Sequence, residues 1–343
     1  MSARPIRRPR SDQALRLGFV GLGWIGRKRL EAIASRDDSR IDALFDCDAE
    51  HLDAVAASYP DAATYDDLSR LLDRPLDGVV IATPNALHAR QAIECLNRGI
   101  PVFCQKPLAV DANETRRIID AARAADRLLA VDYSYRHVRG MTQLKERIRA
   151  GALGEIVAID LEFHNAYAPS KQWCLDRDRS GGGCLLDLGV HLLDLALWLQ
   201  DAPKMKVVRS TLFAQGCNLA RIQNANSRDV EDLAYVELQQ ENGAIVRLAC
   251  SWNAQIGCDA LIGMQIHGTR GGASWRNIDG SFLDFDVWIH RGSARELLGC
   301  SRDDWGPGAL SAWIDRLRHD RSFDPSALTT LQGARLIDEA YRR

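Results

Sequence analysis

The sequence predicts an α/β protein in which a doubly wound parallel sheet is followed by an α+β domain with a large, mostly antiparallel open sheet. Apolar runs alternate with helical patterns from Leu15 to about Arg136, which is typical of a parallel sheet. A glycine-rich motif closes the first of these runs. After about Gly140, long strands of alternating polarity dominate, and these favour an antiparallel sheet.

Five strand-like runs make up the first part of the chain, and helical patterns separate them. The runs are "LRLGFVGLG", "RIDALFD", "DGVVIATP", "PVFCQKP" and "RLLAVDYSY". The helices are expected to extend through Ser35, Tyr59 and Arg98, and from Asp111 to about Asp126. Because the runs are apolar throughout, we expect helices on both faces of the sheet. This predicts one domain over residues 15–136, after a flexible N-terminal arm at residues 1–14.

The second predicted domain covers residues 137–343 and differs from the first in its pattern of helices and strands. A helix from Met141 to about Ala150 and the strand "EIVAIDLEFHN" lead into the apolar stretch "SGGGCLLDLGVHLLDLALWL". The strands that follow are "KVVRSTLFAQG", "DLAYVELQQ", "AIVRLACSWNA", "LIGMQIHGT" and "SFLDFDVWIH". The triplet "ENG" predicts a hairpin turn. Two final helices, at about 308–318 and 326–343, are candidates to pack back on the first domain.

The bulk composition is that of an ordinary soluble globular protein. Of 343 residues, 46% are hydrophobic and 26% charged, and the net charge of −2 gives no field that would recruit nucleic acid or anionic lipid. The longest run without Asp, Glu, Lys or Arg is twelve residues, too short to span a bilayer. Nine cysteines without a CxxC pair favour a reducing, cytoplasmic location over a disulfide framework.

The motif "GLGWIG" follows the first predicted strand and opens a helix. Gly21 permits a tight turn, Gly23 lets the backbone approach a pyrophosphate, and Gly26 allows close packing of the helix. Amides at the helix start, around Trp24 and Ile25, are then expected to hold the phosphates. This arrangement predicts a Rossmann-type, dinucleotide-binding domain.

Asp46 lies twenty residues beyond Gly26, at the end of the second predicted strand. A carboxylate there accepts hydrogen bonds from the adenosine ribose and repels a 2′-phosphate, so the sequence favours NAD, with NADP as the weaker candidate. Asp46 could instead cap the following helix, a role for which Asp48 competes.

Two further segments end strands at the same sheet edge, where ligands bind in such folds. In "FCQKPLAV", Lys106 follows a buried strand, and in "ATPNALH" the side chains after the previous strand come to the same edge. Lys106 is a candidate functional lysine rather than a loop lysine, and His88 is a candidate with a plain helix-face alternative. The expected cofactor contacts from these segments are Thr83, Pro84, Asn85, His88, Gln105 and Lys106.

The apolar stretch carries three ionisable residues, Asp187, His191 and Asp194, on one helical face. An Asp and a His four residues apart can hydrogen-bond, which would orient the imidazole and stabilise its charged form. The stripe is therefore expected to line the cleft between cofactor and substrate. Two alternatives remain open: a buried Asp–His pair that only satisfies itself, and a metal site, which the lack of further ligands disfavours.

Taken together, "GLGWIG", "VVIATPNALH", "CQKP" and "SGGGCLLDLGVHLLD" resemble, in order and spacing, the Gfo/Idh/MocA family of NAD(P)-dependent oxidoreductases. The resemblance covers nearly the whole chain from Leu15, and the glycine triplet followed by D-x-G-x-H-x-x-D is its most specific part. It implies a nucleotide-binding domain, a C-terminal domain with an open sheet, and homodimers or homotetramers built through that sheet.

The same resemblance implies roles for individual residues. Lys106, Asp187 and His191 match the family's catalytic lysine, aspartate and histidine, and Asp194 matches a recurring supporting position. Arg136 resembles a frequent arginine near the substrate, so the expected substrate contacts are Lys106, Arg136, Asp187 and His191. The family usually has Glu where this chain has Gln105, so Lys106 is expected to lose a carboxylate neighbour.

The resulting prediction is an NAD(P)-dependent dehydrogenase or reductase acting on a secondary alcohol or ketone of a sugar, cyclitol or sugar derivative. His191 is expected to take the hydroxyl proton and Lys106 to stabilise the alkoxide. The segment from His164 to Arg179 is expected to wall the substrate pocket. Two rival functions remain: a lyase or glycosidase that uses NAD transiently, and a non-enzymic nucleotide sensor. No metal, nucleic-acid partner or membrane association is expected.

Overall fold

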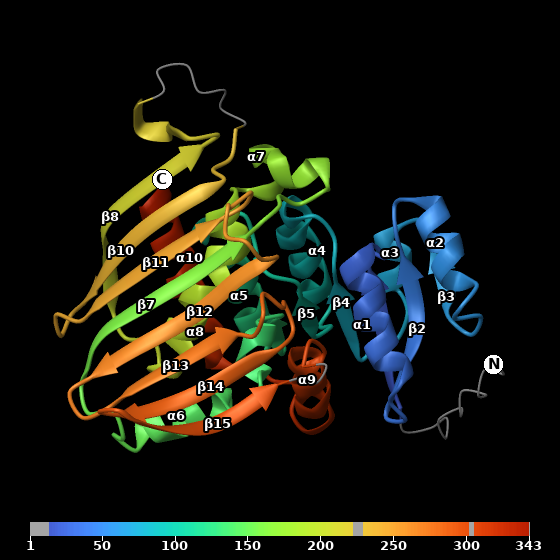
Figure 1. Cartoon of the computed structure of the whole chain (residues 1–343). Helices are drawn as coiled ribbons and strands as arrows, with labels where there is room; N and C mark the ends of the chain where they lie inside the picture. The colour runs from blue at the N-terminus through green and yellow to red at the C-terminus, as the bar shows by residue number, and fades with distance from the viewer. Residues whose placement is uncertain (1–13, 222–228, 302–304, 343) are drawn as a thin grey trace, which may run out of the picture. The chain divides into compact units, whose positions relative to one another are not determined.

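The chain folds into two compact units in the computed structural model, which describes residues 14–221, 229–301 and 305–342 (Figure 1). All but one residue of the predicted N-terminal arm lie outside this range. Unit 1 comprises the described residues of Met1–Gln105, Arg117–Asp132 and Leu310–Ala327, and unit 2 comprises those of Lys106–Arg116, Tyr133–Ala309 and Leu328–Arg343. Relative to the expected division after residue 136, residues 106–116 and 133–136 fall in unit 2, and residues 310–327 fall in unit 1.

A six-stranded parallel sheet forms the centre of unit 1, in the order β3-β2-β1-β4-β5-β6. The strands are β1 (Leu15–Val20), β2 (Ser39–Phe45), β3 (Ala63–Tyr65), β4 (Gly78–Ile81), β5 (Val102–Cys104) and β6 (Leu129–Val131). β1 and β4 are buried along almost their whole length, as their apolar sequences require. This order confirms the doubly wound sheet.

Helices connect these strands in the alternating pattern that the sequence predicts. They are α1 (Trp24–Ala34), α2 (Ala49–Ala56), α3 (Leu68–Leu72), α4 (Asn85–Asn97) and α5 (Ala112–Ala125). β3 and α3 were not predicted. A late helix, α9 (Gly308–His319), adds Trp313 to the core of unit 1, where its ring lies 5.7 Å from that of Phe103. A Cβ on Gly78 would lie 2.5 Å from the Trp313 ring, so a glycine is needed there.

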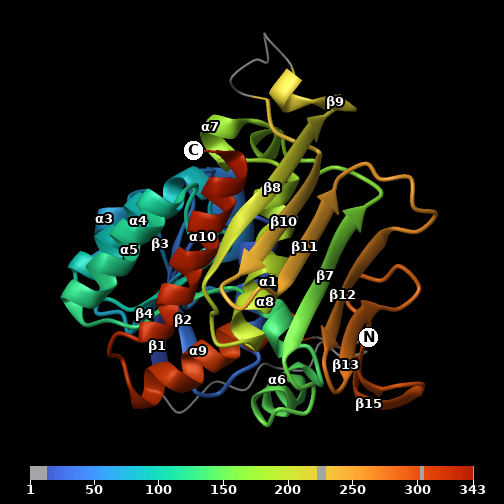
Figure 2. The same ribbon diagram turned by 90° about the vertical axis from the view of Figure 1, so that its left-hand side faces the viewer.

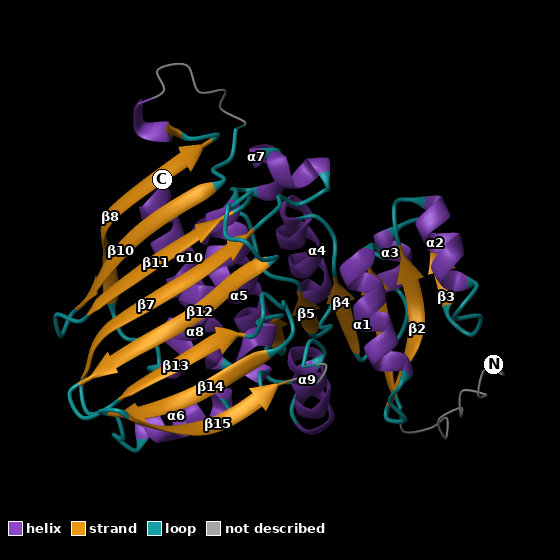
Figure 3. Cartoon of the chain, viewed as in Figure 1, coloured by secondary structure: helices purple, strands orange, loops and turns teal. Residues whose placement is uncertain are grey.

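Unit 2 contains a nine-stranded sheet in the order β15-β14-β13-β12-β7-β11-β10-β8-β9 (Figure 3). Its strands are β7 (Ile156–Asn165), β8 (Met205–Ala214), β9 (Cys217–Asn218), β10 (Leu233–Gln240), β11 (Ile245–Ser251), β12 (Ala260–Gly268), β13 (Gly272–Asn277), β14 (Phe285–Arg291) and β15 (Ala294–Ser301). β7 and β11 pair in parallel, and the other neighbours are antiparallel. The mostly antiparallel sheet is thus confirmed, although β9, β13 and β15 were not predicted.

The predicted "ENG" hairpin joins β10 to β11. Gly243 has a φ of 90°, and its N–H donates to the carbonyl of Gln240 at 2.9 Å. A left-handed residue at this position is the reason that the turn needs glycine.

One face of the nine-stranded sheet is covered by helices of the same unit (Figure 2). These are α6 (Met141–Arg149), α8 (Val190–Leu199) and α10 (Leu328–Tyr341); α7 (Arg177–Ser180) also belongs to this unit. Inward residues of β11 such as Val246 and Leu248 are buried beneath them. The most apolar 18-residue window of the helical stretch Arg177–Leu199 is 89% buried, as in a core helix. The short helical turns are Ser134–His137, Gln172–Leu175, Leu185–Gly189, Leu219–Arg221 and Pro325–Ala327.

Candidate active site

The glycine-rich loop after β1 is built by close backbone contacts. Gly21 has a φ of 92°, and a Cβ there would lie 2.6 Å from the carbonyl of Ala82. A Cβ on Gly26 would lie 2.1 Å from the carbonyl oxygen of Gly21. A side chain at either position would collide with backbone. Glycine therefore lets α1 pack against the loop, and lets the loop pack against the segment that follows β4.

The start of α1 is open. Gly23 is its N-cap residue, and within the described part of the chain no side chain makes a capping hydrogen bond there. Trp24 is 68% exposed and Ile25 is half-buried. Backbone N–H groups at such an end, together with the helix dipole, favour an anionic ligand such as a phosphate.

Asp46 lies beside this loop. Its Oδ2 accepts a hydrogen bond from the backbone N–H of Leu22 at 2.6 Å, and its Oδ1 accepts one from Asp48 at 2.9 Å. The capping role that competed in the sequence belongs to Asp48, whose carboxylate accepts from the N–H groups of Glu50 and His51 at the start of α2. Asp46 is thus free of the capping role and sits at the loop, where a ribose-binding acid is needed.

The loop between β4 and α4 is held from within unit 1. Thr83 donates its hydroxyl to Gln91 at 2.6 Å, and Pro84 and Asn85 begin α4. The His88 side chain is fully buried, with its Nε2 2.8 Å from the carbonyl oxygen of Thr83. His88 therefore supports the loop from inside, whereas a direct contact with a cofactor was expected.

Gln105 belongs to a buried polar cluster after β5. Its side-chain amide donates to Oδ2 of Asp132, and Arg29 of α1 donates to the same oxygen at 2.6 Å. Both partners are almost completely buried. A glutamate at position 105 would place a second carboxylate against Asp132 with one guanidinium to balance both, a like-charge contact that disfavours ionisation. This cluster accounts for glutamine at the position where the family pattern has glutamate.

Lys106 finds its carboxylate partner in Asp187, 81 positions away in the sequence. The Nζ of Lys106 donates to Oδ1 of Asp187 at 2.7 Å and to the Asp187 carbonyl oxygen at 2.8 Å. The indole N–H of Trp252 donates to the other carboxylate oxygen at 3.2 Å. Asp187 is thus fixed by one charged and one neutral donor, and Lys106 is fixed by Asp187.

The predicted hydrogen bond between Asp187 and His191 is not formed in the described part of the chain. Two causes explain the difference. The ammonium of Lys106 and the indole of Trp252 occupy the Asp187 oxygens. In addition, Leu185–Gly189 is a π-helical turn, which is wider than an α-helical turn and changes the register between positions i and i+4. The expectation that Asp187 orients His191 was therefore wrong for this structure.

His191 is placed against aromatic rings instead. Its ring meets Tyr135 edge-on, with centroids 4.9 Å apart, and lies 6.4 Å from Phe163. Its Nδ1 is buried, and it has no hydrogen-bond partner among the described residues. Burial, and secondarily the charge of Lys106, hold the pKa of His191 well below its usual value of 6.5. The imidazole is therefore neutral at neutral pH.

Arg136 and Asp194 form an ion pair in which Asp194 is buried and Arg136 is half-buried. Nε of Arg136 donates to Oδ2 of Asp194 at 2.7 Å, and a second guanidinium nitrogen donates to Oδ1. Burial raises the pKa of Asp194, and Arg136 opposes that shift. Trp198 and Tyr133 flank the guanidinium, with ring centroids 5.8 and 5.1 Å away. Asp194 thus supports Arg136. The side chains of Asp187, His191 and Asp194, which were predicted to share one face, therefore contact different partners.

Cys174 lies in the segment from His164 to Arg179, which was expected to wall the substrate pocket. Burial raises the pKa of the Cys174 thiol to about 11, and the charges of Asp187 and Lys106 act on it in opposite directions. This part of the segment therefore lies within electrostatic reach of the Lys106–Asp187 pair. Within the described ranges, no group of three His, Cys, Asp or Glu residues is placed to hold a metal ion.

Sequence reasoning missed Trp252, Asp132 and Arg29 as members of these clusters. Trp252 follows β11 and Asp132 follows β6, so each lies at a strand end. In the sequence, only their position near the end of a predicted strand marked Trp252 and Asp132 as candidate site residues. It could not show which distant side chain each would meet.

Two family models match the chain. Residues 15–133 match the model described as oxidoreductase family, NAD-binding Rossmann fold, and residues 141–274 match the GFO/IDH/MocA C-terminal domain. The chain belongs to the Gfo/Idh/MocA family of oxidoreductases. Members of this family are enzymes, and the first domain of this chain is an NAD(P)-binding domain.

Individual relatives agree with this assignment. The chain is 28% identical to D-glucoside 3-dehydrogenase of Escherichia coli (strain K12), over 77% of this chain and 78% of that protein. It is 33% identical, over 77% and 75%, to a protein of Amycolatopsis mediterranei (strain S699) named as the provisional oxidoreductase subunit of a UDP-kanosamine synthase. A structure of levoglucosan dehydrogenase with NADH and levoglucosan has the same fold, with a TM-score of 0.81, 22% identity and coverage of 96% and 97%.

The residues of unit 1 fit a dinucleotide. Gly21 and Gly26 let the loop pack tightly at the start of α1, the N-terminus of α1 is open to a phosphate, and Asp46 lies at the same loop. Asp46, Thr83 and Gln105 follow β2, β4 and β5, so they lie toward the carboxyl edge of the parallel sheet, where such folds bind nucleotides.

Proposed function

We propose that the protein is an NAD-dependent dehydrogenase that oxidises a secondary alcohol of a sugar, a cyclitol or a sugar derivative, or reduces the corresponding ketone. The observation that carries this proposal is the Lys106–Asp187 pair in the same unit as His191, whose imidazole is neutral and whose Nδ1 is buried. The relatives named as sugar dehydrogenases support the substrate class. When bound, the dinucleotide accepts the hydride that leaves the carbinol carbon.

Lys106 stabilises charge on the substrate oxygen. An ammonium group has three N–H donors, and Lys106 uses two on Asp187. The third can donate to the oxygen that becomes an alkoxide as the hydroxyl proton leaves. Asp187 keeps this donor in place and, through Trp252, is itself held from the other side. This is stabilisation by a pre-positioned charge.

His191 takes the hydroxyl proton. Its depressed pKa leaves the imidazole neutral at neutral pH, which is the state that can accept a proton. In the direction of oxidation, the O–H bond breaks with its proton going to His191, the C–H bond gives a hydride, and the C–O bond becomes a carbonyl. The reverse direction returns the proton from His191 to the oxygen.

The test is a panel of sugars, cyclitols and nucleotide sugars incubated with the whole protein and NAD. Net NADH production on a polyol supports the proposal. A spectral change of the bound cofactor without net NADH release would instead favour a lyase or glycosidase that cycles the cofactor. Nucleotide binding with no turnover of any substrate would favour a sensor.

We expect NAD to bind more tightly than NADP because of Asp46. Its carboxylate beside the loop should accept the ribose hydroxyls and repel a 2′-phosphate. Asp46→Ala should narrow the difference in binding free energy by about 1–3 kcal/mol, the scale of a charge-assisted hydrogen bond. Fluorescence titration of both cofactors measures this. Asp48→Ala is the matched control, because Asp48 caps α2 and should affect stability but not cofactor choice. Tighter NADP binding by the unmodified protein would overturn the expectation.

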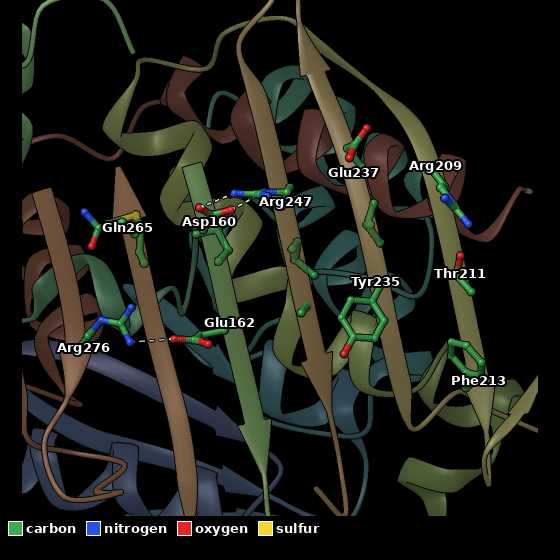
Figure 4. Close-up of a pocket in the computed structure, with 15 residues that line it drawn as sticks. Asp160, Glu162, Arg209, Thr211, Phe213, Tyr235, Glu237, Arg247, Gln265 and Arg276 are labelled. Atoms are coloured by element: carbon green, nitrogen blue, oxygen red, sulfur yellow. Dashed lines mark hydrogen bonds and ion pairs between the residues drawn. The ribbon is translucent and has the colours of Figure 1, made fainter. Parts of the chain in front are cut away.

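We also propose a homodimer or homotetramer that pairs through the face of the nine-stranded sheet opposite α8 and α10. Figure 4 shows Tyr235, Arg209 and Phe213 on this face. Tyr235 is 52% exposed there, and ion pairs such as Arg247–Asp160 lie beside it. A broad, partly apolar face in water favours association.

Light scattering at micromolar concentration should therefore give the mass of a dimer or tetramer. Tyr235→Glu should weaken the assembly by placing a charge in the interface. Leu283→Glu changes a residue that is equally exposed but lies in a loop, and it should leave the assembly intact. A monomeric unmodified protein would contradict the proposal.

A cytoplasmic location is proposed as well. It is supported by nine cysteines, all of which carry free thiols in the structure, including the exposed Cys47, Cys217 and Cys258. Exposed free thiols are typical of a reducing compartment.

A further inference from the structure

Two of the three glycines before the helical segment with Asp187 and His191 leave space for parts of other residues, namely the backbone of Glu231 and the side chain of Tyr341. A Cβ on Gly183 would lie 1.9 Å from the carbonyl oxygen of Glu231, and one on Gly182 would lie 2.3 Å from the hydroxyl oxygen of Tyr341. The glycine triplet is part of the motif that carries the family resemblance. At Gly182 and Gly183 the space is taken by Glu231 and Tyr341.

Glu231 binds three consecutive backbone amides of this turn. Its Oε2 accepts from Gly183 N at 3.1 Å, its Oε1 accepts from Leu185 N at 2.8 Å, and its carbonyl oxygen accepts from Cys184 N at 2.9 Å. Tyr341 of α10 donates its hydroxyl to Oε1 at 2.7 Å. The Glu231 residue is fully buried, so these bonds are shielded from water.

These amides open the helical segment that carries the reactive residues. The N–H of Asp187 bonds to the carbonyl of Gly183, one turn away, and His191 follows four residues later. A helix start has unpaired N–H donors and a positive dipole end, and a carboxylate satisfies both. Because the bonds fix three neighbouring amides, they set the rotation and the axial position of the segment.

We propose that Glu231 and Tyr341 are positioning residues that hold the 183–185 turn, and with it Asp187 and His191, in register with Lys106. This inference rests on the proposed function. Neither residue is assigned a contact with substrate or cofactor; each acts through the turn. A shift of the turn would move the Asp187 carboxylate away from the Lys106 ammonium and change the position of the imidazole.

The experiment uses Tyr341→Phe and Glu231→Gln in the whole protein. Tyr341→Phe removes one donor to Oε1, and Glu231→Gln turns one acceptor oxygen into an NH₂ group that faces a backbone N–H. We expect kcat to fall about 3–30-fold in the first and about 10–100-fold in the second, since small displacements of reacting groups cost up to about 10²-fold. The KM for NAD should stay within about 2-fold. Hydrogen exchange of the amides at 183–185 should accelerate in both variants.

Asp338→Asn is the matched control. Asp338 is also a carboxylate on α10, and it accepts from the N–H of Ala112 at the start of another helix, α5. Its change should leave kcat and the exchange of the 183–185 amides unaltered. The proposal is overturned if both test variants keep the parent's kcat and exchange, or if Asp338→Asn lowers kcat equally, since the effect would then be general destabilisation. Failure of the proposed function shows separately, as an unmodified protein that oxidises no member of the panel, and the exchange measurement still decides whether the turn is held.

Discussion

Replacing Lys106 by methionine is expected to lower kcat by about 10²–10³-fold, the usual cost of removing one donor to a developing oxyanion. Methionine keeps most of the side-chain volume but removes the ammonium that Asp187 holds. The Asp187 carboxylate would keep its bond from Trp252, so the fold of unit 2 should persist. Steady-state kinetics with the identified substrate measure the loss, and cofactor titration should show that NAD still binds.

The Lys106→Met variant should also change the pH profile. The charge of Lys106 contributes to the low pKa of His191, so its removal should raise that pKa toward the ordinary value. The acid limb of residual oxidation activity should therefore move to higher pH. Lys145→Met is the matched control, because Lys145 is likewise partly buried and paired with a carboxylate, that of Asp201. A Lys106→Met enzyme as active as the Lys145→Met enzyme would refute the proposed role.

Replacing His191 by asparagine is expected to lower turnover by about 10²–10⁴-fold, the usual contribution of a positioned acid–base group. NAD binding should be preserved, because the glycine-rich loop and Asp46 belong to unit 1. If His191 had a packing role alone, activity would fall only as far as the protein unfolds. Measuring melting temperature, NAD affinity and turnover on one sample separates these cases, and a folded variant with near-normal turnover would end the catalytic claim.

The His191 pKa also predicts how stability depends on pH. The pKa is lower in the folded protein than in the unfolded chain, so below about pH 6.5 the unfolded state binds more protons. The contribution of this residue is therefore fully present above pH 6.5, and it is lost as the pH falls toward the depressed value. The fall in melting temperature between pH 7 and pH 5 should be smaller in His191→Asn than in the parent. The matched control is His319→Asn, which removes an exposed histidine at the end of α9 and should leave the parent's fall in melting temperature unchanged.

Local sequence was sufficient for most of the fold. The buried runs of β1 and β4 and the alternating pattern of β10 and β11 identify those strands without reference to the rest of the chain. β13 was missed because it begins at Gly272, the second of two glycines, and has only two buried apolar residues, Ala273 and Trp275, too few to show alternation. Pairing with β12 and β14 makes it a strand, and that pairing joins segments that the sequence does not show as neighbours.

The site was predictable by residue type but not by partner. Lys106 and Asp187 could be named from motifs, whereas the hydrogen bond between them joins the end of β5 to a π-helical turn. In the sequence, the nearest candidate partner of Asp187 is His191 on the same helix. The donors that prevailed, Lys106 and Trp252, come from other elements, and a charged ammonium outcompetes a neutral imidazole for a carboxylate.

The place of Trp313 in the chain has a consequence for how the protein is made. Residues through Asp132 leave the ribosome long before Trp313, so the apolar surface at Gly78 and Phe103 stays uncovered while the nine strands of unit 2 are synthesised. The nascent chain thus passes through a stage in which the nucleotide-binding unit is nearly complete but still exposes apolar surface. Exposed apolar surfaces of this kind bind chaperones or other nascent chains. The risk of aggregation is therefore greatest before α9 is translated.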